Sequence, residues 1–68
     1  MNVPENIQEQ VRSVREDGAV NMISANDVQV RASQMNLHEL VVFIEDLRGD
    51  RLRIKGEDWM GFLNSVEW

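Results

Sequence analysis

A wide apolar stripe occupies the middle of this chain. Apolar residues recur there at helical spacing: Leu37, Leu40, Val41, Phe43, Ile44 and Leu47. At about 100° per residue, these positions cover nearly half the circumference of a helix, which is more than a surface helix needs. We therefore predict a central helix over residues 36–48 that touches most of the other elements, with Gly49 at its end.

Two capping signals define the helices on either side of residue 36. Ser24 is followed three residues later by Asp27, a variant of the capping box that predicts a helix over residues 24–35. Asn36 tolerates the left-handed conformation and is also a good N-cap, so we expect it to end one helix and begin the next. The apolar residues from 28 to 32 also alternate, as in a strand, but the cap favours a helix.

Another helix is predicted nearer the N-terminus. Pro4 suits a first helical turn, where its missing N–H costs nothing. Apolar residues follow at helical spacing: Ile7, Val11 and Val14. Arg12 and Glu16 are placed to form an ion pair one turn apart, and Gly18 is the expected C-cap.

The periodicity changes in the tail of the chain. Leu52 and Ile54 alternate with basic residues, as in a short, half-buried strand over residues 51–55. A lone strand leaves its backbone groups unpaired, so its partner would be the apolar connector 19–23 or another chain. Asp58 is then expected to cap a last helix, whose apolar face comprises Trp59, Phe62, Leu63 and Val66.

The predicted fold is therefore a single, mainly α domain over residues 1–68. It has three or four helices and leaves room for one or two short β-strands, at residues 19–23 and 51–55. A chain this short buries only about 60% of the surface that its unfolded form exposes, so good helix packing or self-association must stabilise it. Because it lacks Cys and His38 is its only imidazole, we expect neither a metal nor another cofactor.

Charge and hydropathy narrow the class further. The formal net charge of -5 argues against broad affinity for nucleic acids, which depends on neutralising phosphates. Residues 1–10 have neither the basic start nor the apolar core of a signal peptide, and no apolar run approaches the roughly 20 residues that span a bilayer. We therefore expect a cytoplasmic protein without a membrane partner.

One part of the chain also resembles a known family. The order of its pieces carries the resemblance: Arg15, Asp17 and Gly18 at a helix end, then Asn21-Met22, a spaced Val28 and Ala32, and Glu39-Leu40-Val41 running into Phe43-Ile44-Glu45. From Val11 to about Asp46 the chain is similar to a family of small phage and prophage proteins filed as a domain of unknown function, and G-x-x-N-M is the most specific element. The tail after Gly49 departs from the pattern. The resemblance implies a compact, mainly helical phage accessory protein and carries no activity.

Two groups of residues are not explained by this architecture and are candidate sites. The first group is acidic and comprises Glu39, Val42, Glu45 and Asp46 on the outer face of the central helix, with Trp68 at the end of the sequence. Two exposed, large apolar residues beside clustered acids are typical of a protein-binding patch. The alternative is a solvated helix face and a frayed terminus.

The second group is basic and comprises Arg48, Arg51, Arg53 and Lys55. It would suit a phosphate backbone or an acidic partner, whereas the alternative is a solvated strand face. The predicted helices 24–35 and 36–48 also suggest a helix-turn-helix, with Ala32 as its small residue, Asn36 at the turn and Val42 inside the second helix. However, the outer side of that second helix is acidic, and base recognition favours Arg, Asn or Gln.

These observations leave three functions open. The first is a non-enzymatic interaction protein of phage origin that binds a host or phage protein and modulates or inhibits it, for example as an anti-defence or host-takeover inhibitor. The second is a small nucleic-acid-binding regulator of the helix-turn-helix type. The third is a homo-oligomeric structural protein, such as a homodimer. Since the chain shows no nucleophile, phosphate loop or metal-ligand spacing, we do not expect an enzyme.

Overall fold

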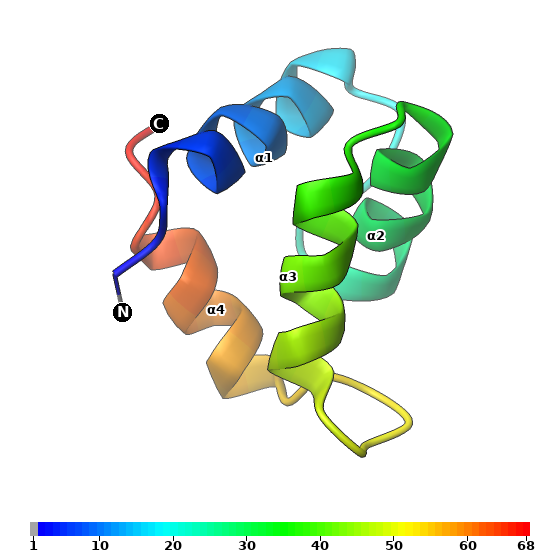
Figure 1. The fold of residues 1–68 in the computed structure, drawn as a ribbon, viewed down its shortest axis with the longest axis vertical. Helices are drawn as coiled ribbons and strands as arrows, with labels where there is room; N and C mark the ends of the chain where they lie inside the picture. Colours follow the sequence, from blue (N-terminus) through cyan, green and yellow to red (C-terminus); the bar gives the residue numbers. More distant parts are fainter. Residues whose placement is uncertain (1) are drawn as a thin grey trace.

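Four α-helices follow one another along residues 2–68, which the computed structural model describes (Figure 1). They are α1 (Glu5–Asp17), α2 (Ala25–Gln34), α3 (His38–Arg48) and α4 (Gly56–Asn64). The mainly α fold is thus confirmed, and within these residues no strand forms. The segment before α1 and the C-terminal segment lie on the same side of the molecule, beside α1 and α4, whereas the loop between α3 and α4 projects away from them (Figure 1).

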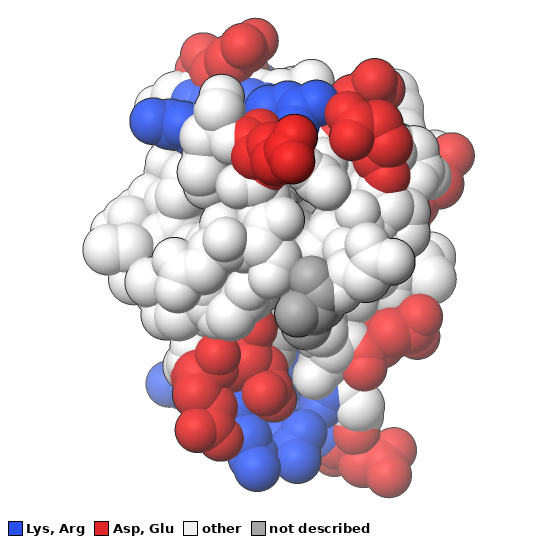
Figure 2. All heavy atoms as spheres, turned by 90° about the vertical axis from the view of Figure 1, so that its left-hand side faces the viewer, with Lys and Arg blue, Asp and Glu red and all other residues white. Residues whose placement is uncertain are grey.

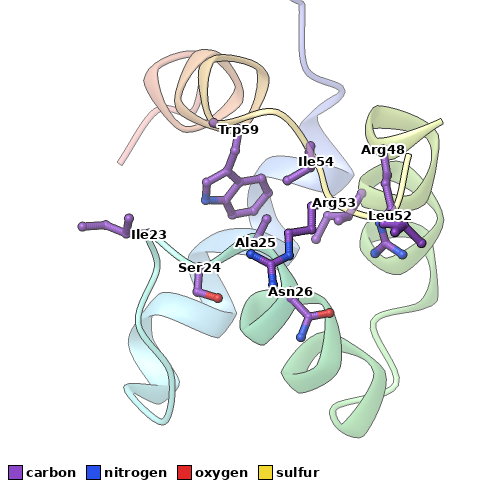
Figure 3. Close-up of a pocket in the computed structure, with 11 residues that line it drawn as sticks. Ile23, Ser24, Ala25, Asn26, Arg48, Leu52, Arg53, Ile54 and Trp59 are labelled. Carbon is purple, nitrogen blue, oxygen red and sulfur yellow. The ribbon is translucent and has the colours of Figure 1, made fainter. Parts of the chain in front are cut away.

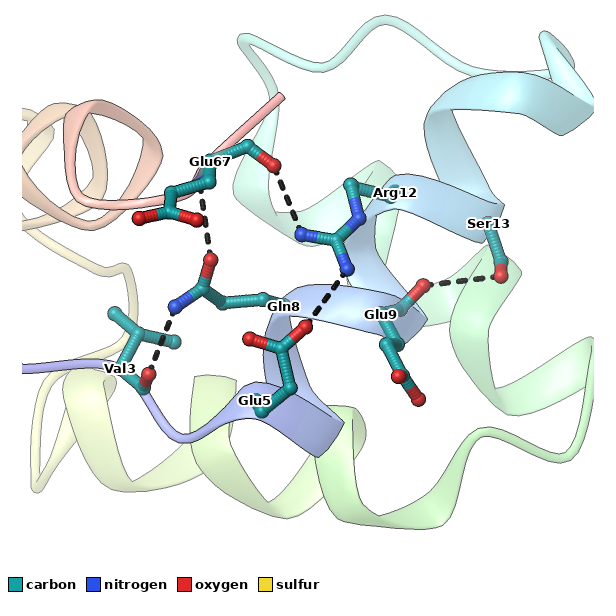
Figure 4. Close-up of polar contacts among 7 residues, drawn as sticks. All are labelled: Val3, Glu5, Gln8, Glu9, Arg12, Ser13 and Glu67. Carbon is teal, nitrogen blue, oxygen red and sulfur yellow. Dashed lines mark hydrogen bonds and ion pairs between the residues drawn. The ribbon is translucent and has the colours of Figure 1, made fainter.

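Helix α1 forms as its apolar spacing predicts. Its buried residues are Ile7, Val11 and Val14, and Gly18 ends it in the left-handed conformation with φ 70°. The expected ion pair between Arg12 and Glu16 is wrong. Arg12 instead pairs with Glu5 at 3.0 Å and donates to the carbonyl of Glu67 at 2.8 Å (Figure 4). Its guanidinium therefore joins the first turn of α1 to the C-terminal segment.

The junction between α2 and α3 depends on Asn36. Ser24 caps α2 by accepting from the backbone N–H of Asp27, as predicted. Asn36 is left-handed with φ 61°, also as predicted, but Leu37 and not Asn36 is the N-cap of α3. An N-cap residue needs an extended backbone, so a residue that closes α2 in the left-handed conformation cannot also open α3.

Helix α3 is central, as its wide stripe predicts. Toward α1, its Leu40 N–H donates to the side chain of Gln10 at 2.9 Å, and toward α2 the Val41 carbonyl accepts from Gln29 at 3.1 Å. Toward α4, the rings of Phe43 and Phe62 lie 5.2 Å apart between centroids. This one helix therefore links the other three.

All four helices, the segment before α1 and the segment after α4 contribute to the core. Its buried apolar residues are Val3, Ile7, Val11, Val14, Ala25, Val28, Ala32, Leu40, Ile44, Trp59, Phe62, Leu63 and Val66. The two largest, Trp59 and Phe62, come from α4, as its predicted apolar face requires, and their rings lie 5.1 Å apart. Fully burying one such side chain contributes roughly 1.5–3 kcal/mol, so α4 is a main source of stability.

The two possible strands do not form. In the segment 19–23, the side chain of Asn21 accepts from the N–H of Ile23 at 3.0 Å, which makes a turn, and so no partner strand exists for residues 51–55. Leu52 is 97% exposed rather than half-buried. Helix α4 then begins at Gly56 with Lys55 as its N-cap, so the prediction that Asp58 caps it is also wrong. Asp58 lies in the first turn, where its charge still favours the helix dipole.

Charge is unevenly distributed over the molecule. On the α4 side, charged side chains gather toward two ends of the surface and leave an uncharged band between them (Figure 2). The sequence of α4 explains part of this band, because residues 59–66 carry no ionisable side chain. On this face, a partner that relies on charge would therefore meet the molecule at one of the two ends.

Candidate functional site

The acidic group predicted on the central helix is split by the structure. Val42 and Asp46 are exposed on its outer side, with Val42 57% exposed. Glu39 turns toward α1 and accepts from Gln10 at 3.2 Å, whereas Glu45 turns toward α2 and accepts from Gln29 at 2.8 Å. The two carboxylates thus support helix packing.

The hydrogen bonds to Glu39 also shift the pKa of its carboxyl group. The N–H of its own backbone lowers the pKa of the Glu39 carboxyl below its ordinary value, and the hydrogen bond from Gln10 acts in the same direction. Both interactions stabilise the charged form. Glu39 is therefore an ionised residue held against α1.

Trp68 belongs to a different part of the surface. Its ring lies under the guanidinium of Arg15, 5.0 Å from the centroid, and its Nε1 donates to the carbonyl of Leu63 at 3.1 Å. It remains 50% exposed and lines a shallow hollow on α1 with Arg12, Arg15 and Glu16. The structure therefore holds Trp68 on α1 and does not place it in one patch with the outer face of α3.

The basic group is also divided. Arg48 is half-buried, donates to the side chain of Gln29 and lies 3.4 Å from Glu45. Arg51, Arg53 and Lys55 are exposed on the loop that follows. Arg48 is consequently a fixed part of the α2–α3 packing, whereas the loop residues face solvent.

A pocket of about 560 Å³ opens beside this loop (Figure 3). Four parts of the chain form it: the start of α2, the end of α3, the connecting loop and the start of α4. Its lining residues are Ile23, Ser24, Ala25, Asn26, Ile44, Arg48, Leu52, Arg53, Ile54, Gly56 and Trp59. The pocket was not predicted from the sequence, because its walls come from segments that are distant along the chain.

The pocket is cationic in an acidic protein. Arg48 and Arg53 line it and no acidic residue does, although the whole chain has a formal net charge of -5. The N-terminus of α2 adds partial positive charge to one wall. Within residues 2–68, the side chain of Arg53 has no hydrogen-bond or ion-pair partner. An anion that entered would thus meet an unused guanidinium.

The floor of the pocket is apolar and well fixed. Trp59 is 2% exposed, and its Nε1 donates to the carbonyl of Met22 at 2.9 Å, so the ring is fixed in the floor and its N–H is not free to bind a ligand (Figure 3). Ile44 and Ala25 are buried beside it. The arrangement can therefore hold an apolar group below an anion.

The part of the chain that the structure describes holds neither a metal-ligand cluster nor a membrane-spanning helix. Among these residues, no three His, Cys, Asp or Glu side chains gather as metal ligands would. The helices here are 9 to 13 residues long, and none has the length and apolar character to cross a membrane.

Comparison with known proteins shows the family of this chain. Residues 1–54 match the family described as a domain of unknown function, DUF5049. The chain belongs to this family. Membership of a family of unknown function, expected from the segment Val11–Asp46, is thereby confirmed over a wider range. No curated protein and no solved structure matches the chain.

The family match ends between two structural elements. It covers α1, α2, α3 and the loop as far as Ile54, and it ends before α4. Most of the pocket lining lies inside the matched range, whereas Gly56 and Trp59 lie outside it. The fourth helix therefore completes the pocket from beyond the family match.

Proposed function

We propose that this protein is a non-enzymatic interaction protein that binds another protein at the mouth of the pocket and modulates or inhibits it. The observation that carries the proposal is the exposure of two large apolar side chains there: Ile23 is 71% exposed and Leu52 is 97% exposed, and both line the pocket. Apolar side chains beside polar and charged groups are typical of protein interfaces. Covering these two side chains would remove apolar surface from water and favour association.

The resemblance to a family of small phage and prophage proteins suggests where such a protein would act. A phage-type accessory protein would act in the cytoplasm of a bacterial host, and an anti-defence or host-takeover inhibitor is the concrete form. A domain of 68 residues would inhibit by covering a surface of its target. The outer face of α3, with Val42 and Asp46, is the alternative docking surface.

A nucleic-acid regulator is supported less well. In a helix-turn-helix, α3 would present exposed Glu39, Val42 and Asp46 to the phosphates. The basic loop offers Arg51, Arg53 and Lys55, but Arg48 is already bonded within the fold. A protein partner also accounts for the exposed Ile23 and Leu52, which phosphates would not cover.

The test is capture of partners from a lysate of the bacterial host, followed by mass spectrometry. Three forms would be used as bait: the unchanged protein, the double variant Ile23→Asp with Leu52→Asp, and Val42→Asp as the matched control. All three positions are exposed, so each variant should retain the fold, which circular dichroism would check. We expect one host or phage protein to be lost with the double variant only.

Other outcomes would contradict the proposal. Loss of the partner with Val42→Asp alone would place the interface on α3. Recovery of nucleic acid without any protein would favour a nucleic-acid regulator instead. A mass in solution of two or more copies, abolished by the double variant, would make the interface one between copies of this chain.

A further inference from the structure

We infer that the pocket binds an acidic segment of the partner protein, with one Asp or Glu side chain on Arg53 and a neighbouring apolar side chain against Trp59. This inference rests on the proposed function and adds the chemistry of the segment that is recognised. The ligand is an internal acidic side chain of a peptide.

The charge of the pocket is opposite to that of most of the molecule. Charge favours an acidic ligand here, because the pocket lining contains two arginines and no carboxylate, and Arg53 is not neutralised by an ion pair within residues 2–68. Much of the remaining surface is acidic, since the chain has 12 acidic and 7 basic residues. An acidic segment would therefore be attracted to this pocket in preference to other parts of the molecule.

The two arginines of the pocket have different roles. Arg48 is committed to Gln29 and Glu45 and forms a fixed wall. Arg53 has no such partner among residues 2–68, and its side chain extends from the loop across the pocket toward the first turn of α2, where Asn26 lies (Figure 3). A guanidinium in this position can donate two hydrogen bonds to one carboxylate.

The pocket can also hold an apolar part of the ligand. Ile54 and the ring of Trp59 line the pocket, and its volume of about 560 Å³ falls in the range of sites for ligands rather than for whole helices. A free small anion would leave Ile23 and Leu52 uncovered at the rim. A peptide that continues past the pocket on both sides would cover them, which favours a protein segment as the occupant.

The experiment uses Trp59 as the reporter. In a Trp68→Phe background, Trp59 is the only tryptophan, so its fluorescence reports on the pocket directly. A display library of random heptapeptides would be selected against this protein. We expect enriched peptides to carry Asp or Glu beside Leu, Ile, Phe or Met. The best synthetic peptide should shift the emission of Trp59, and its acid-to-amide form should bind about tenfold more weakly or worse.

Two loop variants provide the matched comparison. Arg53→Glu should weaken binding of the acidic peptide by about tenfold or more, because it removes the donor and repels the carboxylate. Arg51→Glu makes the same charge change in the same loop at a residue that does not line the pocket, so it should have a clearly smaller effect. Equal effects of the two variants would reduce the interaction to general charge attraction and overturn the inference.

The remaining outcomes are also decisive. Selection of no peptide, enrichment without acids, or tighter binding of an eight-nucleotide oligothymidylate would each overturn it. If partner capture fails with the Ile23 and Leu52 variant but survives Arg53→Glu, the proposed function stands and this inference falls. If acidic peptides bind through Arg53 and the host yields no protein partner, the proposed function falls instead.

Discussion

Asp17 ends α1 at the point where the helix dipole disfavours an acidic side chain. Arg31 of α2 offsets this, because its Nε and Nη2 each donate to a different carboxylate oxygen of Asp17 at 2.8 Å. The hydrogen bond from Arg31 lowers the pKa of Asp17 below its ordinary value, and the same bond raises the pKa of Arg31. One bidentate pair therefore joins the end of α1 to the last turn of α2.

This pair predicts how stability depends on pH. A carboxyl whose pKa is lower in the folded state stabilises the fold above its unfolded pKa, close to 3.8, and this contribution is lost as the pH falls through the lower, folded value. Asp17→Asn should thus lower the unfolding midpoint at pH 7, and its difference from the unchanged protein should shrink below about pH 4. Urea unfolding between pH 2.5 and 7 measures this difference.

The control for this prediction is Asp46→Asn. Asp46 is exposed and has no ion-pair partner in the described part of the chain, so its substitution should change the midpoint little at any pH. A difference between Asp17→Asn and the unchanged protein that stays constant down to pH 2.5 would show that Arg31 does not act through the charge of Asp17.

At the scale of elements, periodicity and caps predicted all four helices because those signals are local. The stripes in α1 and α3, the cap at Ser24 and the stop at Gly18 act within a few residues. The possible strand at 51–55 failed for a non-local reason. Its alternation is real, but a strand needs a partner, and the side chain of Asn21 turns the candidate segment within this chain, 19–23, away from an extended form.

Gly61 gives a prediction about α4. It lies inside the helix, and a Cβ added there would meet nothing within 4 Å. Gly61→Ala should therefore stabilise the protein by up to about 1 kcal/mol, because alanine loses less backbone entropy in a helix. For a domain of this size that raises the thermal midpoint by roughly 4–8 °C. Thermal unfolding followed by circular dichroism measures the shift.

Gly49 is the matched control, since a Cβ there would also meet open space. Its backbone, at φ 62° and ψ -133°, is nevertheless one that side chains other than glycine rarely adopt. Gly49→Ala should accordingly destabilise by about 1–3 kcal/mol. Shifts of the same sign for the two variants would mean that space, and not backbone conformation, decides the outcome.

At the scale of the whole molecule, the pocket shows why the candidate site was harder to predict than the fold. The basic segment was identified from the sequence, but the sequence did not predict that Arg48 would be bonded within the fold while the loop residues stay exposed. Whether Arg48 bonds to Gln29 and Arg53 faces a pocket depends on where α2 and α4 pack. Likewise, Trp59 was predicted on the apolar face of the last helix, and it is a core residue that also lines the pocket. Such double roles arise from packing, which local spacing does not encode.

The end of the family match at Ile54 leads to a prediction about the molecule as a unit. Without residues 55–68, the core loses four of its 13 buried apolar residues, including the two largest, Trp59 and Phe62. Replacing one buried Phe by Ala commonly costs about 3–5 kcal/mol, and a domain of this size is stable by only roughly 3–10 kcal/mol. We expect the fragment 1–54 to show a nearly unfolded circular dichroism spectrum.

Adding the peptide 55–68 in trans tests whether α4 acts through these contacts. Helicity should return on addition, and the peptide carrying Phe62→Ala should restore it poorly, because the ring that packs on Phe43 and Trp59 is missing. The peptide carrying Met60→Ala should restore it nearly as well as the unchanged peptide, since Met60 lies exposed on the same helix. Cooperative unfolding of the fragment 1–54 by itself would instead show that α1, α2 and α3 form a complete domain, to which α4 adds only the pocket.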